Sequence, residues 1–173
     1  PGSYLLRALS GLDTALWDLY GRLKEKPVAS LIGGGPKKIR VYGSSMRRDI
    51  TPINESIRLC KLRDKLGITA FKFRVGSECG RDMDEWEGRS KEIVKTLSRD
   101  LGNKVDKLVD GNSCFSPESA IELGKFMQDY GISHFEEPCP YWEHDQTKVV
   151  KEALEIDVAG GEQDCDMSTW KST

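Results

Sequence analysis

The sequence predicts an α/β fold, an incomplete TIM-like (β/α) barrel of about five βα units. Short runs typical of strands alternate strictly with longer amphipathic segments typical of helices. In addition, Asp110, Glu136 and Glu162 each close a short apolar run, and each is separated from the next by 26 residues, the length of about one βα unit. Because right-handed crossovers bring the carboxyl ends of parallel strands to one edge, we expect three carboxylates at a common rim.

The first part of the chain is predicted to precede the barrel. Leucines at three- and four-residue steps predict an amphipathic helix over residues 5–23, which ends near Lys26-Pro27. A short apolar piece at 28–32 leads into a Gly-Gly-Gly-Pro turn at 33–36. We therefore expect residues 1–38 to form a helix and linker, and residues 39–173 to form the N-terminal part of the barrel domain.

The first three strands are expected at residues 39–44, 70–75 and 106–110. Thr51-Pro52 has the pattern of an N-cap followed by proline at the first helical position, which predicts a helix that runs to Gly67. A charged segment over 82–98 predicts the next helix.

The same alternation continues to the end of the sequence. Ser116-Pro117 repeats the cap-plus-proline pattern and predicts a helix that stops at Tyr130-Gly131. A strand ending at Glu136, a helix over 147–154 and a strand ending at Glu162 follow.

Composition excludes several classes of protein. With 173 residues, 38% of them hydrophobic, and a net charge of −2, the chain can form a core, and it lacks the basic excess of a nucleic-acid binder. Five cysteines without a C-x-x-C pair indicate reduced thiols in a cytoplasmic protein. Since no apolar stretch approaches the roughly 20 residues of a membrane span, we expect no membrane partner.

The strand over 70–75 adds two cations to the three acids. The alternation of strand side chains places Lys72 and Arg74 on one face and Phe71, Phe73 and Val75 on the other. With the apolar face against the helices, both cations point into the barrel, near carboxylates that suit Mg²⁺. Lys72 could then serve as a base with a lowered pKa. Alternatively, the two cations are internal counter-charges for the acids.

Several motifs together resemble one enzyme family. They are the Gly11-Leu-Asp-Thr-Ala-Leu-Trp-Asp-Leu-Tyr-Gly21 helix, Lys72-x-Arg74, Asp110, Glu136-Glu-Pro138 and Gly161-Glu162-Gln163. In this order they resemble the mandelate racemase/muconate lactonizing branch of the enolase superfamily over nearly the whole chain. The resemblance implies a modified (β/α)7β barrel, a Mg²⁺ ion held by Asp110, Glu136 and Glu162, and removal of the proton α to a substrate carboxylate to give an enediolate.

Arg74 departs from the family pattern, in which racemase-like members commonly have a second lysine as the base. Because a guanidinium stays protonated at ordinary pH, Lys72 is the better base candidate and Arg74 a substrate-binding or charge-stabilising group; an arginine acting as the base stays open. Asn112 and Ser44 are candidate substrate contacts, with a turn residue and a solvated loop as the respective alternatives. Arg48, in the loop after the first strand, could also contact an acidic substrate, with a solvated loop as the alternative.

The favoured function is an acid-sugar dehydratase, or a racemase or cycloisomerase of the same type. The polar loop over 44–48 and the Lys72/Arg74 pair suit a hydroxylated, anionic substrate. Family enzymes also have a capping domain before the first helix and further strands after the third metal ligand, so we expect a fragment of a longer enzyme and a homo-oligomer. The alternatives are a catalytically inactive barrel fragment and an aldolase-type barrel in which Lys72 forms a Schiff base.

Overall fold

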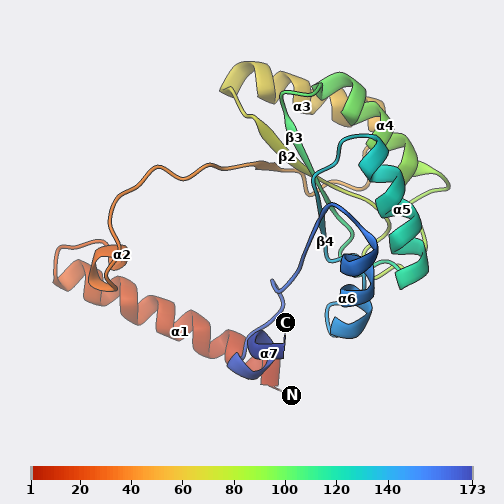
Figure 1. Ribbon diagram of the computed structural model, residues 1–173. Coiled ribbons are helices and arrows are strands. Elements are labelled where there is room, and N and C mark those ends of the chain that lie inside the picture. Colours follow the sequence, from red (N-terminus) through yellow and green to blue (C-terminus); the bar gives the residue numbers. More distant parts are fainter. Residues whose placement is uncertain (1, 173) are drawn as a thin grey trace. The chain divides into compact units, whose positions relative to one another are not determined.

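The computed structural model describes residues 2–172 (Figure 1). Contacts between residues divide them into two compact units. One unit contains the residues up to Arg40 together with those from Asp164 onward, and the other is Val41–Gln163. The second unit contains the whole sheet and all of the candidate site.

Five parallel strands form one sheet in the order β1-β2-β3-β4-β5, and a helix connects each strand to the next. The predicted α/β alternation is therefore confirmed. The elements of this unit are β1 (Gly43–Ser44), α3 (Pro52–Leu66), β2 (Ala70–Arg74), α4 (Arg89–Leu101), β3 (Asp106–Asp110), α5 (Pro117–Asp129), β4 (His134–Glu136), α6 (His144–Ala153) and β5 (Asp157–Ala159).

One face of the sheet packs against the helices. Phe73 on β2, Val109 on β3 and Phe135 on β4 are register partners and are fully buried. They belong to one apolar cluster with residues from all four connecting helices, α3 to α6. Burial of this cluster is the main force that fixes the sheet, and it leaves the other face of the strands for polar side chains.

Both cap-plus-proline predictions are confirmed. The Thr51 hydroxyl accepts a hydrogen bond from the Asn54 amide at the start of α3, and the Ser116 hydroxyl accepts one from the Ser119 amide at the start of α5. Each bond satisfies a backbone amide that has no partner within the helix. Proline at the first helical position costs no hydrogen bond, because the N–H that it lacks would have had no partner there.

The helix predicted over 82–98 begins later, at Arg89. Its expected first residues form turns instead of a helix. There the Asp82 side chain accepts a hydrogen bond from the Ser116 backbone amide, and the Asp84 side chain accepts one from the Ser90 backbone amide. Gly88 then precedes the helix with φ of 79°. Aspartate side chains readily accept hydrogen bonds from backbone amides, and such bonds compete with helix formation.

Two predicted strands are shorter than expected. The strand over 39–44 is reduced to Gly43–Ser44, which pair with Phe71 and Lys72 on β2. The strand expected to end at Glu162 ends at Ala159, the register partner of Glu136 on β4.

The other unit contains α1 (Gly2–Leu23), α2 (Val28–Leu31) and α7 (Met167–Ser172), so the helix predicted over 5–23 is confirmed. None of the helices within residues 2–172 combines the length and the apolar character that a membrane crossing requires.

Candidate active site

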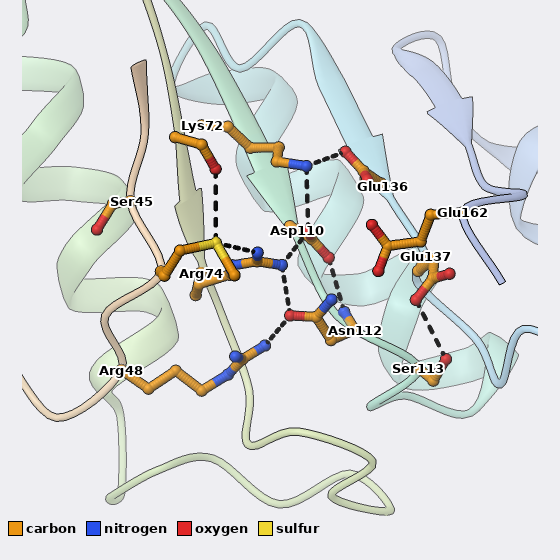
Figure 2. Close-up of polar contacts among 12 residues, drawn as sticks. Ser45, Arg48, Lys72, Arg74, Asp110, Asn112, Ser113, Glu136, Glu137 and Glu162 are labelled. Atoms are coloured by element: carbon orange, nitrogen blue, oxygen red, sulfur yellow. Dashed lines mark hydrogen bonds and ion pairs between the residues drawn. The ribbon is translucent and has the colours of Figure 1, made fainter. Parts of the chain in front are cut away.

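The register of the sheet aligns the polar side chains at its carboxyl edge. Arg74, Asp110 and Glu136 are consecutive partners across β2, β3 and β4. Because side chains in register on parallel strands point to the same face, these three lie side by side, opposite the buried phenylalanines. Lys72 lies one step deeper on the same face of β2 (Figure 2).

The Lys72 ammonium lies between two carboxylates. Its Nζ donates a hydrogen bond to Glu136 Oε2 at 2.5 Å and lies 3.3 Å from Asp110 Oδ2, and the residue is only 5% exposed. Burial alone would lower the pKa of this amine, but the hydrogen bond to Glu136 and the charges of Asp110 and Glu136 outweigh burial and raise it. Lys72 is therefore protonated in this arrangement, and the lowered pKa expected of a base is wrong here because two carboxylates hold the charge.

Arg74 completes the ion-paired cluster. Its Nη1 donates to Asp110 Oδ2 and to the side-chain oxygen of Asn112, and its Nη2 lies 2.8 Å from the Met46 sulfur. Asp110 is fully buried and is paired with both Lys72 and Arg74. The cations thus serve as counter-charges for the acids, which a carboxylate at this depth requires.

Glu137 is a further acid of this cluster, although strand alternation predicts a structural acid on the opposite face at this position. It is 4% exposed, its Oε1 has no hydrogen-bond partner, and its Oε2 accepts only a long, 3.5 Å bond from the Ser113 hydroxyl. Burial, followed by the charges of Glu162, Asp110 and Glu136, raises the pKa of Glu137 to about 7. The available signal was the Glu-Glu-Pro motif, but strand alternation placed the second glutamate on the opposite face.

Two of the three predicted metal ligands lie side by side at the ends of neighbouring strands, and the third lies beyond the end of its strand. Asp110 and Glu136 are register partners, whereas Glu162 is exposed and follows the end of β5 by three residues. Within residues 2–172, no three histidine, cysteine, aspartate or glutamate side chains are close enough together to hold an ion. Lys72 and Arg74 instead form ion pairs with the carboxylates of Asp110 and Glu136.

The donor set nevertheless fits a hard divalent cation. Carboxylate oxygens are the ligands that Mg²⁺ prefers, and they project from the ends of neighbouring strands. The charges of Asp110, Glu136 and Glu162 all act on Glu137, so this edge carries a concentration of negative charge of the kind that a bound cation neutralises.

The two predicted substrate contacts occupy different settings. Ser44 is the register partner of Lys72 but is exposed, and its hydroxyl lies 3.8 Å from the Met46 sulfur. Asn112 has φ of 43°, and its backbone N–H donates a hydrogen bond to Asp110 Oδ1 at 2.9 Å. That turn directs the Asn112 side chain toward the guanidiniums at the edge of the sheet (Figure 2).

Arg48 reaches the same cluster from the loop after β1. Its Nη2 donates to Asn112 Oδ1 at 2.6 Å and its Nε donates to the Gly76 carbonyl at 3.0 Å. A third guanidinium, that of Arg89, is fully buried and donates to the carbonyls of Arg74 and Arg47. Arg89 therefore joins the end of β2 to the loop that carries Arg48; nothing in its helical sequence pattern indicated this role.

Comparison with known proteins identifies the family. Residues 55–173 match the enolase C-terminal domain-like family, and residues 2–33 match the N-terminal domain of mandelate racemase/muconate lactonizing enzymes. The chain belongs to the mandelate racemase/muconate lactonizing enzyme family of the enolase superfamily.

Curated relatives in this family are longer than the chain. Arabinonate dehydratase of Saccharolobus solfataricus is 32% identical over 163 residues, which are 91% of this chain and 40% of the relative. L-talarate/galactarate dehydratase of Salmonella typhimurium is 25% identical over 158 residues, or 91% of this chain and 38% of the relative. The chain thus spans about two fifths of the length of these relatives.

Solved structures of the family share the fold. A protein of Roseobacter denitrificans described as a candidate racemase is 60% identical, with a TM-score of 0.95 over 99% of this chain and 47% of its own. A mandelate racemase/muconate lactonizing protein from Paracoccus denitrificans, crystallised with magnesium, is 26% identical, with a TM-score of 0.85 over 95% of this chain and 44% of its own. The five βα units are therefore part of the enolase-type barrel, as predicted.

Proposed function

We propose that this chain carries the metal-binding and proton-transfer part of a Mg²⁺-dependent enzyme that removes the proton α to a carboxylate, and that its reaction is the dehydration of an acid sugar. The observation that carries the proposal is the alignment of Arg74, Asp110 and Glu136 across three neighbouring strands, with the Lys72 ammonium between the two acids. Acids and cations of this kind at the carboxyl edge of a barrel are the usual material of an active site.

In this proposal Asp110, Glu136 and Glu162 would hold Mg²⁺. When bound, the ion supplies positive charge that offsets the negative charge developing on the substrate carboxylate as the α-proton leaves. Asp110 and Glu136 now pair with Lys72 and Arg74, so the site already contains the cationic partners that a substrate carboxylate would engage.

Lys72 is the proposed proton-transfer residue and Arg74 the proposed substrate-binding residue. The guanidinium stays protonated at any ordinary pH, so Nζ of Lys72 is the atom of this pair that can exchange a proton. Lys72 would do so once Mg²⁺ takes its place on Asp110 and Glu136, because these two ion pairs are what hold the amine protonated. In the dehydration, the proton on Cα and the hydroxyl on Cβ leave the substrate as water, and the resulting enol becomes a 2-oxo acid. Asn112 and Ser44 are proposed to contact the substrate hydroxyls.

The choice of acid sugars is supported by the relatives and by the site. Arabinonate and talarate/galactarate dehydratases both carry acid-sugar substrates in their names. The polar loop after β1 and the cations of β2 suit a hydroxylated anion. Arabinonate has one carboxylate and galactarate has two, so the relatives leave the number of acidic groups open.

The test is calorimetric titration of the chain with Mg²⁺, with Glu136→Gln as the variant and Glu155→Gln, on an exposed residue after α6, as the matched control. We expect saturable binding in the parent and in the control, and a loss of at least about ten-fold in affinity in Glu136→Gln, because one carboxylate ligand is removed. Equal binding in all three proteins would contradict the metal site.

A second measurement addresses the reaction. Acid sugars incubated with the chain and Mg²⁺ should yield 2-oxo acids, and Lys72→Met should abolish their formation while the Mg²⁺ affinity is retained. Trapping of substrate on Lys72 by borohydride would instead indicate Schiff-base chemistry and overturn the proposed role of this lysine.

A further inference from the structure

Arg48 is a cation without a carboxylate in direct contact. Both of its hydrogen bonds go to uncharged oxygens, those of the Asn112 side chain and the Gly76 carbonyl, and no carboxylate within residues 2–172 forms an ion pair with it. Asp110 and Glu78 attract Arg48 only at longer range. A half-buried guanidinium usually has a carboxylate or another anion as its partner.

A second guanidinium increases the excess of positive charge. Asn112 Oδ1 accepts from Arg74 as well as from Arg48, so two like charges converge on one neutral atom (Figure 2). Burial, followed by the charge of Arg74, lowers the pKa of Arg48. Arg74 has Asp110 as its counter-ion, whereas the charge of Arg48 is left for another anion to balance.

The guanidinium of Arg48 has free donors and a fixed position. Of its five N–H groups, only one on Nε and one on Nη2 donate hydrogen bonds within residues 2–172, which leaves the two on Nη1 and the second on Nη2 for a ligand. The loop is held because the Ser45 amide donates to the Lys72 carbonyl at 2.8 Å and Arg89 donates to the Arg47 carbonyl at 3.4 Å. Such a preorganised planar fork matches a carboxylate.

We propose that Arg48, together with Arg74 and the Asn112 amide that joins them, binds a second carboxylate of the substrate, so that the enzyme acts on sugar diacids in preference to sugar mono-acids. This inference rests on the proposed function, in which the first carboxylate lies at the edge formed by Asp110 and Glu136. It specifies the substrate by the number of its acidic groups, and it gives Arg48 a role in specificity that is separate from proton transfer.

The test compares acids that differ only at their far end. The dissociation constants of galactarate and galactonate, and of glucarate and gluconate, are measured by calorimetry in saturating Mg²⁺ for the parent chain and for Arg48→Gln and Arg48→Lys. The matched control is Arg47→Gln, since Arg47 has the same charge one residue away but is exposed and paired with Asp49. Thermal unfolding of each variant establishes that it is folded.

We expect the parent to bind at least one diacid about ten- to hundred-fold more tightly than its mono-acid, the range of one charge-assisted hydrogen-bonded pair. In Arg48→Gln the diacid-to-mono-acid ratio should fall to about one, in Arg48→Lys it should fall partly, and in Arg47→Gln it should be unchanged. A ratio that survives Arg48→Gln, or an equal loss for both acids, would overturn the proposal and leave Arg48 a structural residue.

The two proposals fail in different ways. Mono-acids that bind as tightly as diacids in the parent, with binding abolished by Glu136→Gln, would overturn the diacid preference and support the metal-dependent site. If neither kind of acid binds while Mg²⁺ is present at saturation, the proposed function fails, and the role of Arg48 fails with it.

Discussion

Glu137 makes the folding of this chain depend on pH. Its pKa is about 7 in the folded state against an ordinary value of 4.5, so the folded state binds the proton more tightly. The folded state therefore loses stability from this group as pH rises from about 4.5 to 7, and the whole penalty is present above pH 7.

Glu137→Gln should remove this penalty. With the metal removed by a chelator, we expect the variant to exceed the parent in free energy of unfolding by on the order of 2 kcal/mol at pH 8, and by much less at pH 5. Urea unfolding at the two pH values measures the difference. A stability difference that is the same at both would show that the effect does not come from the ionisation of Glu137.

At the residue scale, strand alternation was sufficient to predict part of the site. Lys72, Arg74, Asp110 and Glu136 lie within regular strands, so their faces follow from their positions in the sequence. Glu137 follows the end of β4 with φ of 41°, a conformation outside the strand region, and alternation fails there. For the same reason, no periodic pattern could decide between the two readings of Arg48, which lies in an irregular loop.

At the scale of elements, two glycines with the same backbone conformation have different surroundings. Gly67, which ends α3, has φ of 67°, and a Cβ atom there would meet nothing within 4 Å. Gly76, which follows β2, has φ of 62°, and a Cβ atom there would lie 2.5 Å from the sulfur of Cys114 and 2.8 Å from the ring of Phe115.

We expect Gly76→Ala to cost more stability than Gly67→Ala. Both variants place a side chain in the left-handed region, at a cost of about 1 kcal/mol, but only Gly76→Ala forces core atoms apart, at a further cost of about 1–3 kcal/mol. Denaturant unfolding of both variants measures the gap. If the two lose equal stability, the contact between the turn at Gly76 and the Cys114 region is looser than described.

Helix starts were predictable where the cap is local and unpredictable where it is not. Thr51 and Ser116 bond to amides three residues ahead, so the signal lies within a few letters of sequence. The late start of α4 depends on Asp82, which accepts the amide of Ser116, 34 residues further along the chain. A prediction from local sequence cannot detect a bond between residues this far apart in the chain.

For the whole molecule, the sheet of Val41–Gln163 has two open edges. β1 and β5 each have a single neighbour among the described strands, so their outer backbone groups are available for pairing with another chain. We expect the 173-residue polypeptide to self-associate, with a weight-average mass in sedimentation equilibrium that rises with protein concentration. A constant monomer mass up to high concentration is the result that would count against this expectation.

Arg89 has a consequence for how the candidate site can change. Its fully buried guanidinium donates to the carbonyls of Arg74 and Arg47, so the backbone that carries the side chains of the site is anchored by a buried group. The Arg48 side chain can then be exchanged without displacing the loop that presents it, whereas Arg74 is itself buried and is a counter-charge of Asp110. A mutational library that tests which anions the candidate site binds should vary position 48 and leave Arg89 untouched, because Arg89 holds the backbone on which that position depends.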